Sequence, residues 1–246
     1  MAINCIAKDG VSTITLDRPN CLNALNIEHL EALVKHLAAF ENDLSTRAIV
    51  IAGKGPSFCA GADIKAMQRM TPAEFAHATS LYSALARLTR RLPQAIIGAL
   101  HGYVLGGGLE LALWCDLRMC AKNTTFGLPD AALGFTPTGG LTQRLTDIIG
   151  LSRSMDMVLT TRHIDDQTAL NWGLVSQICP PDTLHQLTTE LATIIATRPK
   201  NCIADCKRLL YDNQYRSFND VLQSEEYYDN KCFNSEELSL HLPPKI

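Results

Sequence analysis

One apolar stretch, residues 94–115, most constrains how this chain can fold. An apolar run turns at His101 and Gly102, and three consecutive glycines, Gly106–Gly108, then precede a helix-forming segment that carries Glu110. This order predicts a strand, a turn and a helix N-terminus. Glycines let a ligand approach the backbone closely, and the first turn of a helix leaves N–H groups unpaired at the positive end of its dipole. The corner can hold an anion or a developing oxyanion, or the glycines could serve only close packing of strand on helix.

Two carboxylates are candidate acid/base groups. Glu110 lies among Leu, Ala and Trp residues, where desolvation raises a carboxyl pKa, and Asp130 follows Pro129 in a turn further along the chain. Carboxylates that flank one position can hold a water molecule, so that one accepts its proton and the other delivers a proton to carbon. Alternatively, Asp130 is only a turn residue and Glu110 is a buried ion-pair partner.

A second corner follows the apolar strand predicted at residues 48–52. The segment Ala60-Gly61-Ala62-Asp63-Ile64-Lys65 opens a helical pattern, and its small residues again expose backbone N–H groups. Two N–H donors that converge on one oxygen are what a thioester carbonyl needs when it becomes an enolate. Asp63 could instead be only a helix cap.

The rest of the chain alternates strands with helices, which predicts an α/β fold. Further strands are expected at residues 11–16, 115–121 and 174–178, and helices from Ile27 and at residues 72–92, 144–150 and 152–160. In the helix at 72–92, Phe75, Leu81, Leu85 and Leu88 are expected to face inward. Three helices, at 183–197, 199–211 and 219–230, follow. We therefore divide the chain into a catalytic core, residues 1–198, and a C-terminal helical segment, residues 199–246.

Composition excludes several classes of protein. Hydrophobic residues make up 46% of the chain and charged residues 19%, as in globular proteins, and the net charge of −3 gives no general attraction to nucleic acid or to an acidic membrane surface. The nine cysteines include no Cys-x-x-Cys pair, so we expect mostly small buried hydrophobes rather than a metal site or a disulfide framework. The N-terminus has no export signal, which predicts a cytoplasmic protein. His101, Glu110 and the glycines argue against a membrane span in the apolar stretch.

Several segments, in their order and spacing, resemble the enoyl-CoA hydratase/isomerase (crotonase) superfamily. They are Arg18-Pro19 with Asn23-Ala24-Leu25, and residues 58–67, 101–119, 126–137, 142–145 and 172–175. The resemblance implies a crotonase-like spiral of repeated ββα units and C-terminal helices that build a homotrimer or a hexamer made of two trimers. It also implies an acyl-CoA substrate, of which coenzyme A is a part, so that neither a separate cofactor nor a metal is expected.

The resemblance also implies roles for individual residues. The N–H groups of Ala62 and Gly107 would form the oxyanion hole, and Glu110 and Asp130 would be the two catalytic carboxylates. The residues expected to bind substrate are Ala60, Ala62, Asp63, Ile64, Lys65 and Gly107, with Lys65 near the adenine.

Three features depart from the family pattern. Asp130 stands where Glu is usual, which withdraws the carboxylate by about the ~1.5 Å of one C–C bond. The paired glycines of the 134–140 loop come one position early, with Leu141 in the place of Gly. The chain ends in SLHLPPKI, without the usual Phe and Lys that approach coenzyme A, which leaves a carrier-protein thioester as an alternative substrate.

The resulting hypothesis is a hydratase that converts a 2-enoyl-CoA thioester into 3-hydroxyacyl-CoA. An enoyl-CoA isomerase, a dehydratase acting on a carrier-protein thioester, and a non-catalytic binding protein are the alternatives. The acyl tail could be lined by Met67, Met70, Tyr82, Trp114 and Phe135, although ordinary core is the favoured interpretation of each.

Overall fold

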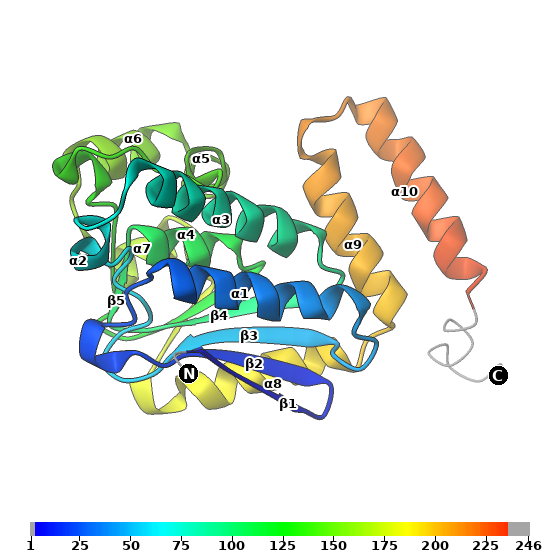
Figure 1. Cartoon of the computed structure of the whole chain (residues 1–246). Coiled ribbons are helices and arrows are strands. Elements are labelled where there is room, and N and C mark those ends of the chain that lie inside the picture. The colour runs from blue at the N-terminus through cyan, green and yellow to red at the C-terminus, as the bar shows by residue number, and fades with distance from the viewer. Residues whose placement is uncertain (1–2, 236–246) are drawn as a thin grey trace.

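The computed structural model describes residues 3–235, which form a mixed α/β fold around a six-stranded sheet (Figure 1). Only the first two strands are antiparallel to each other; every later pair in the sheet is parallel. In spatial order, the strands are β1 (Ile3–Lys8), β2 (Val11–Leu16), β3 (Ala48–Gly53), β4 (Ala95–Leu100), β6 (Leu117–Ala121) and β9 (Gln177–Cys179). Parallel strands need crossover connections, and helices supply them.

Helices cover both faces of this sheet. In Figure 1, α1 (Ile27–Ala39) and α3 (Pro72–Arg91) lie above it and α8 (Leu184–Ala196) lies below. Side chains alternate accordingly: Ile49 and Ile51 of β3 belong to the larger core, and Ala48 and Val50 belong to the core beneath α8. The central strands are therefore apolar on both sides, as the sequence predicted for β3.

The apolar stretch at 94–115 forms two strands and one helix. β4 is followed by β5 (Tyr103–Leu105) and then by α4 (Gly107–Trp114), in which every residue is buried. β5 pairs with β7 (Thr125–Gly127), which in turn pairs with β8 (Ile164–Asp165) in a second, three-stranded sheet. A helix that is apolar all round belongs in the interior, so α4 forms the centre of the molecule.

The remaining elements surround this centre. They are α2 (Ile64–Met67), η3 (Asp130–Leu133), α5 (Leu141–Ile149), α6 (Leu151–Thr160), α7 (Asp166–Asn171) and the C-terminal pair α9 (Lys200–Asp212) and α10 (Phe218–Phe233). Four short 3-10 segments link them: Pro19–Cys21, Phe40–Asn42, Pro181–Thr183 and Asn213–Tyr215. Within residues 3–235, no helix combines the length and the apolar character needed to cross a membrane.

The helix starts follow the sequence signals. Asn26 caps α1 by accepting the N–H of His29 at 3.1 Å, as predicted. α3 begins at Pro72 behind a capping box formed by Thr71 and Glu74. Leu81, Leu85 and Leu88 are buried, but Phe75 is 39% exposed and lies 5.7 Å from Phe135 between ring centroids, so the prediction of an inward Phe75 was wrong.

Other predictions also need correction. The last strand starts at Gln177 instead of residue 174, because Leu174 and Val175 are buried in the turn before it. Of the nine cysteines, only Cys59, Cys115, Cys120 and Cys179 are buried, so the cysteines are not mostly core residues. The chain end in which the sequence lacks the usual Phe and Lys lies outside the described residues.

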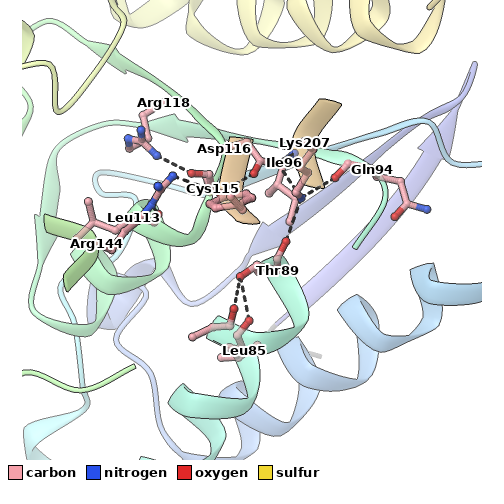
Figure 2. A network of polar contacts seen from close by, with 12 residues as sticks. Leu85, Thr89, Gln94, Ile96, Leu113, Cys115, Asp116, Arg118, Arg144 and Lys207 are labelled. Atoms are coloured by element: carbon pink, nitrogen blue, oxygen red, sulfur yellow. Dashed lines mark hydrogen bonds and ion pairs between the residues drawn. The ribbon is translucent and has the colours of Figure 1, made fainter. Parts of the chain in front are cut away.

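A buried lysine fastens the C-terminal helix pair to the body of the molecule (Figure 2). The Nζ of Lys207, on α9, donates to the carbonyls of Thr89 and Gln94 at 2.9 Å each and pairs with Asp116 at 2.9 Å. Asp116 also accepts the N–H of Ile96 at 2.7 Å and the hydroxyl of Tyr211 at 2.8 Å. α9 is thereby joined to the ends of α3, β4 and α4, whereas no residue of α10 is buried.

Candidate active site

A cavity of about 160 Å³ opens beside the N-terminus of α4. Most of the residues that the sequence singled out line it: Ala60, Ala62, Ile64, Gly107, Glu110 and Asp130. The two glycine-containing corners and the two carboxylates are therefore brought to one place, although they come from three separate segments of the chain.

The two corners are in contact. The N–H of Leu25 donates to the carbonyl of Gly61 and the N–H of Asp63 donates to the carbonyl of Leu25, both at 2.8 Å, which leaves the intervening Ala62 N–H directed away from Leu25. A Cβ on Gly61 would lie 3.3 Å from the amide nitrogen of Gly107. Gly107 is the first residue of α4 and has no intrahelical acceptor. Neither the Ala62 nor the Gly107 N–H finds an acceptor among the residues described.

A steric constraint favours glycine at each of the three consecutive positions, Gly106–Gly108. Gly106 has φ 48° and ψ −122°, which an L side chain rarely adopts. A Cβ on Gly107 would lie 2.4 Å from the phenol oxygen of Tyr82, and one on Gly108 would lie 2.2 Å from the carbonyl oxygen of Cys59. Close packing therefore explains Gly108, and at Gly107 the same close packing accompanies a free N–H.

Glu110 is a buried carboxyl held by one residue. Only 3% of Glu110 is exposed, and its Oε1 accepts the N–H of Thr138 at 2.8 Å, while the Thr138 hydroxyl lies 3.2 Å from both carboxylate oxygens. Burial raises the pKa of Glu110 to about 7, against the opposing effect of the Thr138 hydrogen bonds. Glu110 forms no ion pair within residues 3–235, so the ion-pair alternative was wrong.

Asp130 supplies a second desolvated carboxyl. It opens the short η3 segment, and burial raises its pKa above the ordinary value. Its Oδ2 is buried, has no hydrogen-bond partner in the described part of the chain, and lies 3.6 Å from where a Cβ of Gly106 would be. A turn residue needs no such buried oxygen, so the turn accounts for the backbone of Asp130 but not for its side chain.

Asp63 and Lys65 do not line the cavity. The Asp63 carboxylate caps α2 by accepting the N–H of Ala66 at 3.1 Å and pairs with Arg18 at 2.8 Å, so the helix-cap alternative describes it. Arg18 also donates to the carbonyl of Ala24 at 3.0 Å, which ties the N-terminal segment to the corner. Lys65 lies exposed on α2.

Two residues that support the site were given no role from the sequence. Thr138 binds Glu110 from a loop 28 residues away, and no local pattern marks that contact. Asn23 is buried with φ 56°, and its amide donates to the carbonyls of Lys54 and Ser57 at 3.0 and 2.7 Å, which holds the loop before the second corner. Asn adopts the left-handed backbone more readily than most residues, so an Asn in the turn after Arg18-Pro19 was a signal for that conformation.

Of the proposed tail residues, Met67, Met70, Tyr82 and Phe135 line this cavity, whereas Trp114 lines a different one. No cluster of three or more His, Cys, Asp or Glu side chains arranged to bind a metal occurs within residues 3–235.

These features define a class of protein: an α/β fold in which two free backbone N–H groups and two desolvated carboxyls face one largely apolar cavity. Such a site suits a carbonyl compound that becomes an enolate. The chain belongs to the enoyl-CoA hydratase/isomerase family, whose model matches residues 7–240.

Individual relatives agree with this placement. The chain is 32% identical over 234 residues to the short-chain-enoyl-CoA hydratase of Clostridium acetobutylicum, covering 94% of this chain and 90% of that protein. It is 38% identical over 226 residues to the probable enoyl-CoA hydratase echA8 of Mycobacterium bovis, covering 92% and 85%. The crystal structure of enoyl-CoA hydratase from Bacillus anthracis matches with a TM-score of 0.92 at 31% identity, over 96% of this chain and 92% of that one. The predicted crotonase fold is confirmed.

Proposed function

We propose that this protein is an enoyl-CoA hydratase that adds water across the 2,3 double bond of a 2-enoyl-CoA thioester to give 3-hydroxyacyl-CoA. The observation that carries the proposal is the pair of desolvated carboxyls, Glu110 and Asp130, in the same cavity as the free N–H groups of Ala62 and Gly107. The names of the two hydratase relatives support it. Coenzyme A is part of the substrate in this proposal, and no separate cofactor takes part.

The geometry supports a mechanism in which each group has one task. The thioester oxygen accepts the two N–H groups, which stabilise the negative charge that develops on it. Glu110, with a pKa of about 7, is ionised in a large fraction of molecules at neutral pH and accepts a proton from water as that water bonds to C3. Asp130, which burial favours in the protonated form, delivers a proton to C2. Asp130 is one methylene shorter than Glu, so its unpartnered Oδ2 would reach C2 through a closer backbone or through a water.

Substrate binding and assembly remain predictions that the surface supports. Ala60 and Ile64 border the cavity, and exposed Lys65 with neighbouring Asp63 would meet the coenzyme A portion outside it. The apolar side chains of Phe218, Tyr227 and Phe233 on α10 are 75%, 65% and 71% exposed, as expected if α10 packs in a homotrimer or a hexamer. The cytoplasmic location and the division at residue 198 also stay predictions.

Asp130→Asn tests the second carboxyl. The amide keeps the shape of the side chain but cannot deliver a carboxyl proton, so kcat for hydration of crotonyl-CoA should fall by at least about 100-fold. Asp182→Asn, the same change at an exposed position, is the matched control and should leave kcat unaltered. Turnover by Asp130→Asn at the wild-type rate would show that Asp130 is not the acid.

Thr138→Val tests how Thr138 affects the pKa of Glu110. The variant keeps the backbone N–H bond to Glu110 but loses the hydroxyl, whose hydrogen bond lowers the pKa of Glu110. A general base must be ionised, so kcat/KM should rise as pH increases through about 7 in the wild type, and this rising limb of the pH profile should move to higher pH in the variant. Thr142→Val, at an exposed site on α5, should leave the limb in place; an unmoved limb in Thr138→Val would contradict the account.

One observation favours a second candidate, an enoyl-CoA isomerase. Glu110 is held by Thr138, whereas the Oδ2 of Asp130 has no partner among the residues described, and isomerisation would use mainly one carboxylate. Incubation with a 3-enoyl-CoA separates the two functions, because isomerisation leaves the mass unchanged and hydration adds one water.

A further inference from the structure

Two buried aromatic rings meet behind the cavity. Tyr82 of α3 and Trp114 of α4 are 8% and 6% exposed, and their rings pack edge to face with centroids 6.1 Å apart. Glu110 and Trp114 are four residues apart on α4 and therefore lie on the same side of that helix, one turn apart. An acyl chain placed past Glu110 along α4 would meet this pair of rings.

The rings separate two cavities. The cavity described above has Tyr82 and Thr138 in its wall, and a second cavity of about 290 Å³ has Ser83, Trp114 and Gly139 in its wall. Tyr82 and Ser83 are consecutive residues that line different cavities, and the same holds for Thr138 and Gly139. The Tyr82 ring lines the first cavity and the Trp114 ring lines the second. The Tyr82–Trp114 pair, which we call the end wall, lies between them.

The backbone around the end wall is shaped to admit both rings. A Cβ on Gly107 would lie 2.4 Å from the phenol oxygen of Tyr82, and a Cβ on Gly139 would lie 2.4 Å from Cζ2 of Trp114. The indole N–H of Trp114 also donates to the carbonyl of Gly139 at 2.9 Å. The early position of the glycines in the 134–140 loop, noted from the sequence, is thereby explained for Gly139.

The phenol oxygen of Tyr82 is buried and has no hydrogen-bond partner in the described part of the chain. An unpartnered buried hydroxyl is destabilising, so hydrogen bonding does not account for a tyrosine at this position. It fills the space above the Gly107 α-carbon, which completes the end wall.

We propose that the end wall is the chain-length determinant of this enzyme and restricts it to short-chain 2-enoyl thioesters. This inference rests on the proposed hydratase function and specifies its substrate class. An acyl chain that runs from the free N–H groups past Glu110 along α4 ends at the two rings, so only a short chain fits in this direction. A longer tail needs the second cavity, which the end wall closes off.

The test compares kcat/KM for 2-butenoyl-CoA and 2-decenoyl-CoA in the wild type, Tyr82→Phe and Tyr82→Ala. The wild type should prefer the butenoyl substrate by at least about tenfold, since steric exclusion of several methylenes outweighs the effect of one. Tyr82→Phe keeps the ring and should keep this preference. Tyr82→Ala opens the end wall and should reduce the preference at least about tenfold.

Further variants test whether the longer acyl chain enters the second cavity when Tyr82 is replaced. Ala86→Leu places a larger side chain in the second cavity, so it should cancel the gain for 2-decenoyl-CoA when added to Tyr82→Ala. Ser80→Ala, at an exposed position of α3, is the control and should behave as the wild type. If Tyr82→Ala does not fold, Tyr82→Leu replaces it, and the wild-type preference is measured in either case.

The proposed role of the end wall would be overturned if the wild type used both substrates equally. It would also be overturned if a folded Tyr82→Ala or Tyr82→Leu variant kept the wild-type preference. Either result would leave the hydratase proposal intact. Failure of the wild type to hydrate either substrate would instead overturn the proposed function, on which the end-wall inference rests.

Discussion

Replacing Glu110 with Gln is expected to lower kcat for 2-enoyl-CoA hydration by about 10²–10⁴-fold, the size of a general acid/base contribution. Gln is close in shape to Glu and can still accept the Thr138 N–H through its Oε1, so the site keeps its form. Only the ability to take up a proton is lost. Steady-state rates with crotonyl-CoA measure the effect, and Glu190→Gln, an exposed carboxyl on α8, is the matched control.

The same variant should be more stable than the wild type at alkaline pH. The pKa of Glu110 rises from its ordinary 4.5 to about 7 on folding, so between these values the unfolded chain has released the proton that the folded protein still holds. The free energy of unfolding of the wild type therefore falls as pH rises through this window, by about 3 kcal/mol in total. Gln cannot ionise, so Glu110→Gln should gain up to about 3 kcal/mol over the wild type near pH 8 and little near pH 4.

Urea denaturation at the two pH values checks this prediction. A gain in stability together with a loss of activity would show that the variant is folded and that the lost activity is chemical. A variant that loses activity and is less stable near pH 8 would contradict the buried, proton-accepting role of Glu110.

Lys207→Met should cost about 3–5 kcal/mol of unfolding free energy, because it removes one partner of a buried ion pair. Lys207 is only 8% exposed, and its loss leaves Asp116 without its cation and the carbonyls of Thr89 and Gln94 without this donor (Figure 2). The hydrocarbon of Met fills much of the same space, so the effect reports the missing charge rather than a cavity.

Lys54→Met is the matched control for this variant. Lys54 pairs with Asp17 at the same 2.9 Å distance, but its side chain is 60% exposed, so its loss should cost less than about 1 kcal/mol. Urea denaturation of both variants at neutral pH makes the comparison. Similar losses in the two variants would contradict the structural role given to the Lys207 network.

The elements with clear periodicity could be predicted from the sequence. α1 begins as expected after Asn26 and α3 begins as expected at Pro72, and β3 matches its apolar run. β1 was missed because it is an edge strand whose side chains after Ile3 are exposed, so it lacks an apolar pattern. β5 was missed because three residues are too few to show a period.

Only those parts of the site that have a recognisable local sequence pattern could be predicted. Glycine corners and carboxyls after turns have such a pattern, and the structure brings Ala62, Gly107, Glu110 and Asp130 to one cavity. The contacts that tune them do not: Thr138 meets Glu110 across 28 residues, and the end wall joins α3 to α4. Asp63 was expected to bind substrate, and the structure shows that it caps α2. The sequence could not distinguish the two roles, because a residue that caps a helix and one that binds a ligand at the helix start have the same local pattern.

The most direct test of the account is the fate of water when the wild-type protein is incubated with crotonyl-CoA in water labelled with the heavy isotope of oxygen. We expect 3-hydroxybutyryl-CoA with one labelled oxygen on C3, formed rapidly by the wild type and at least about 100-fold more slowly by Glu110→Gln. A product with a shifted double bond and no labelled oxygen, or equal labelling rates in the two proteins, would contradict it.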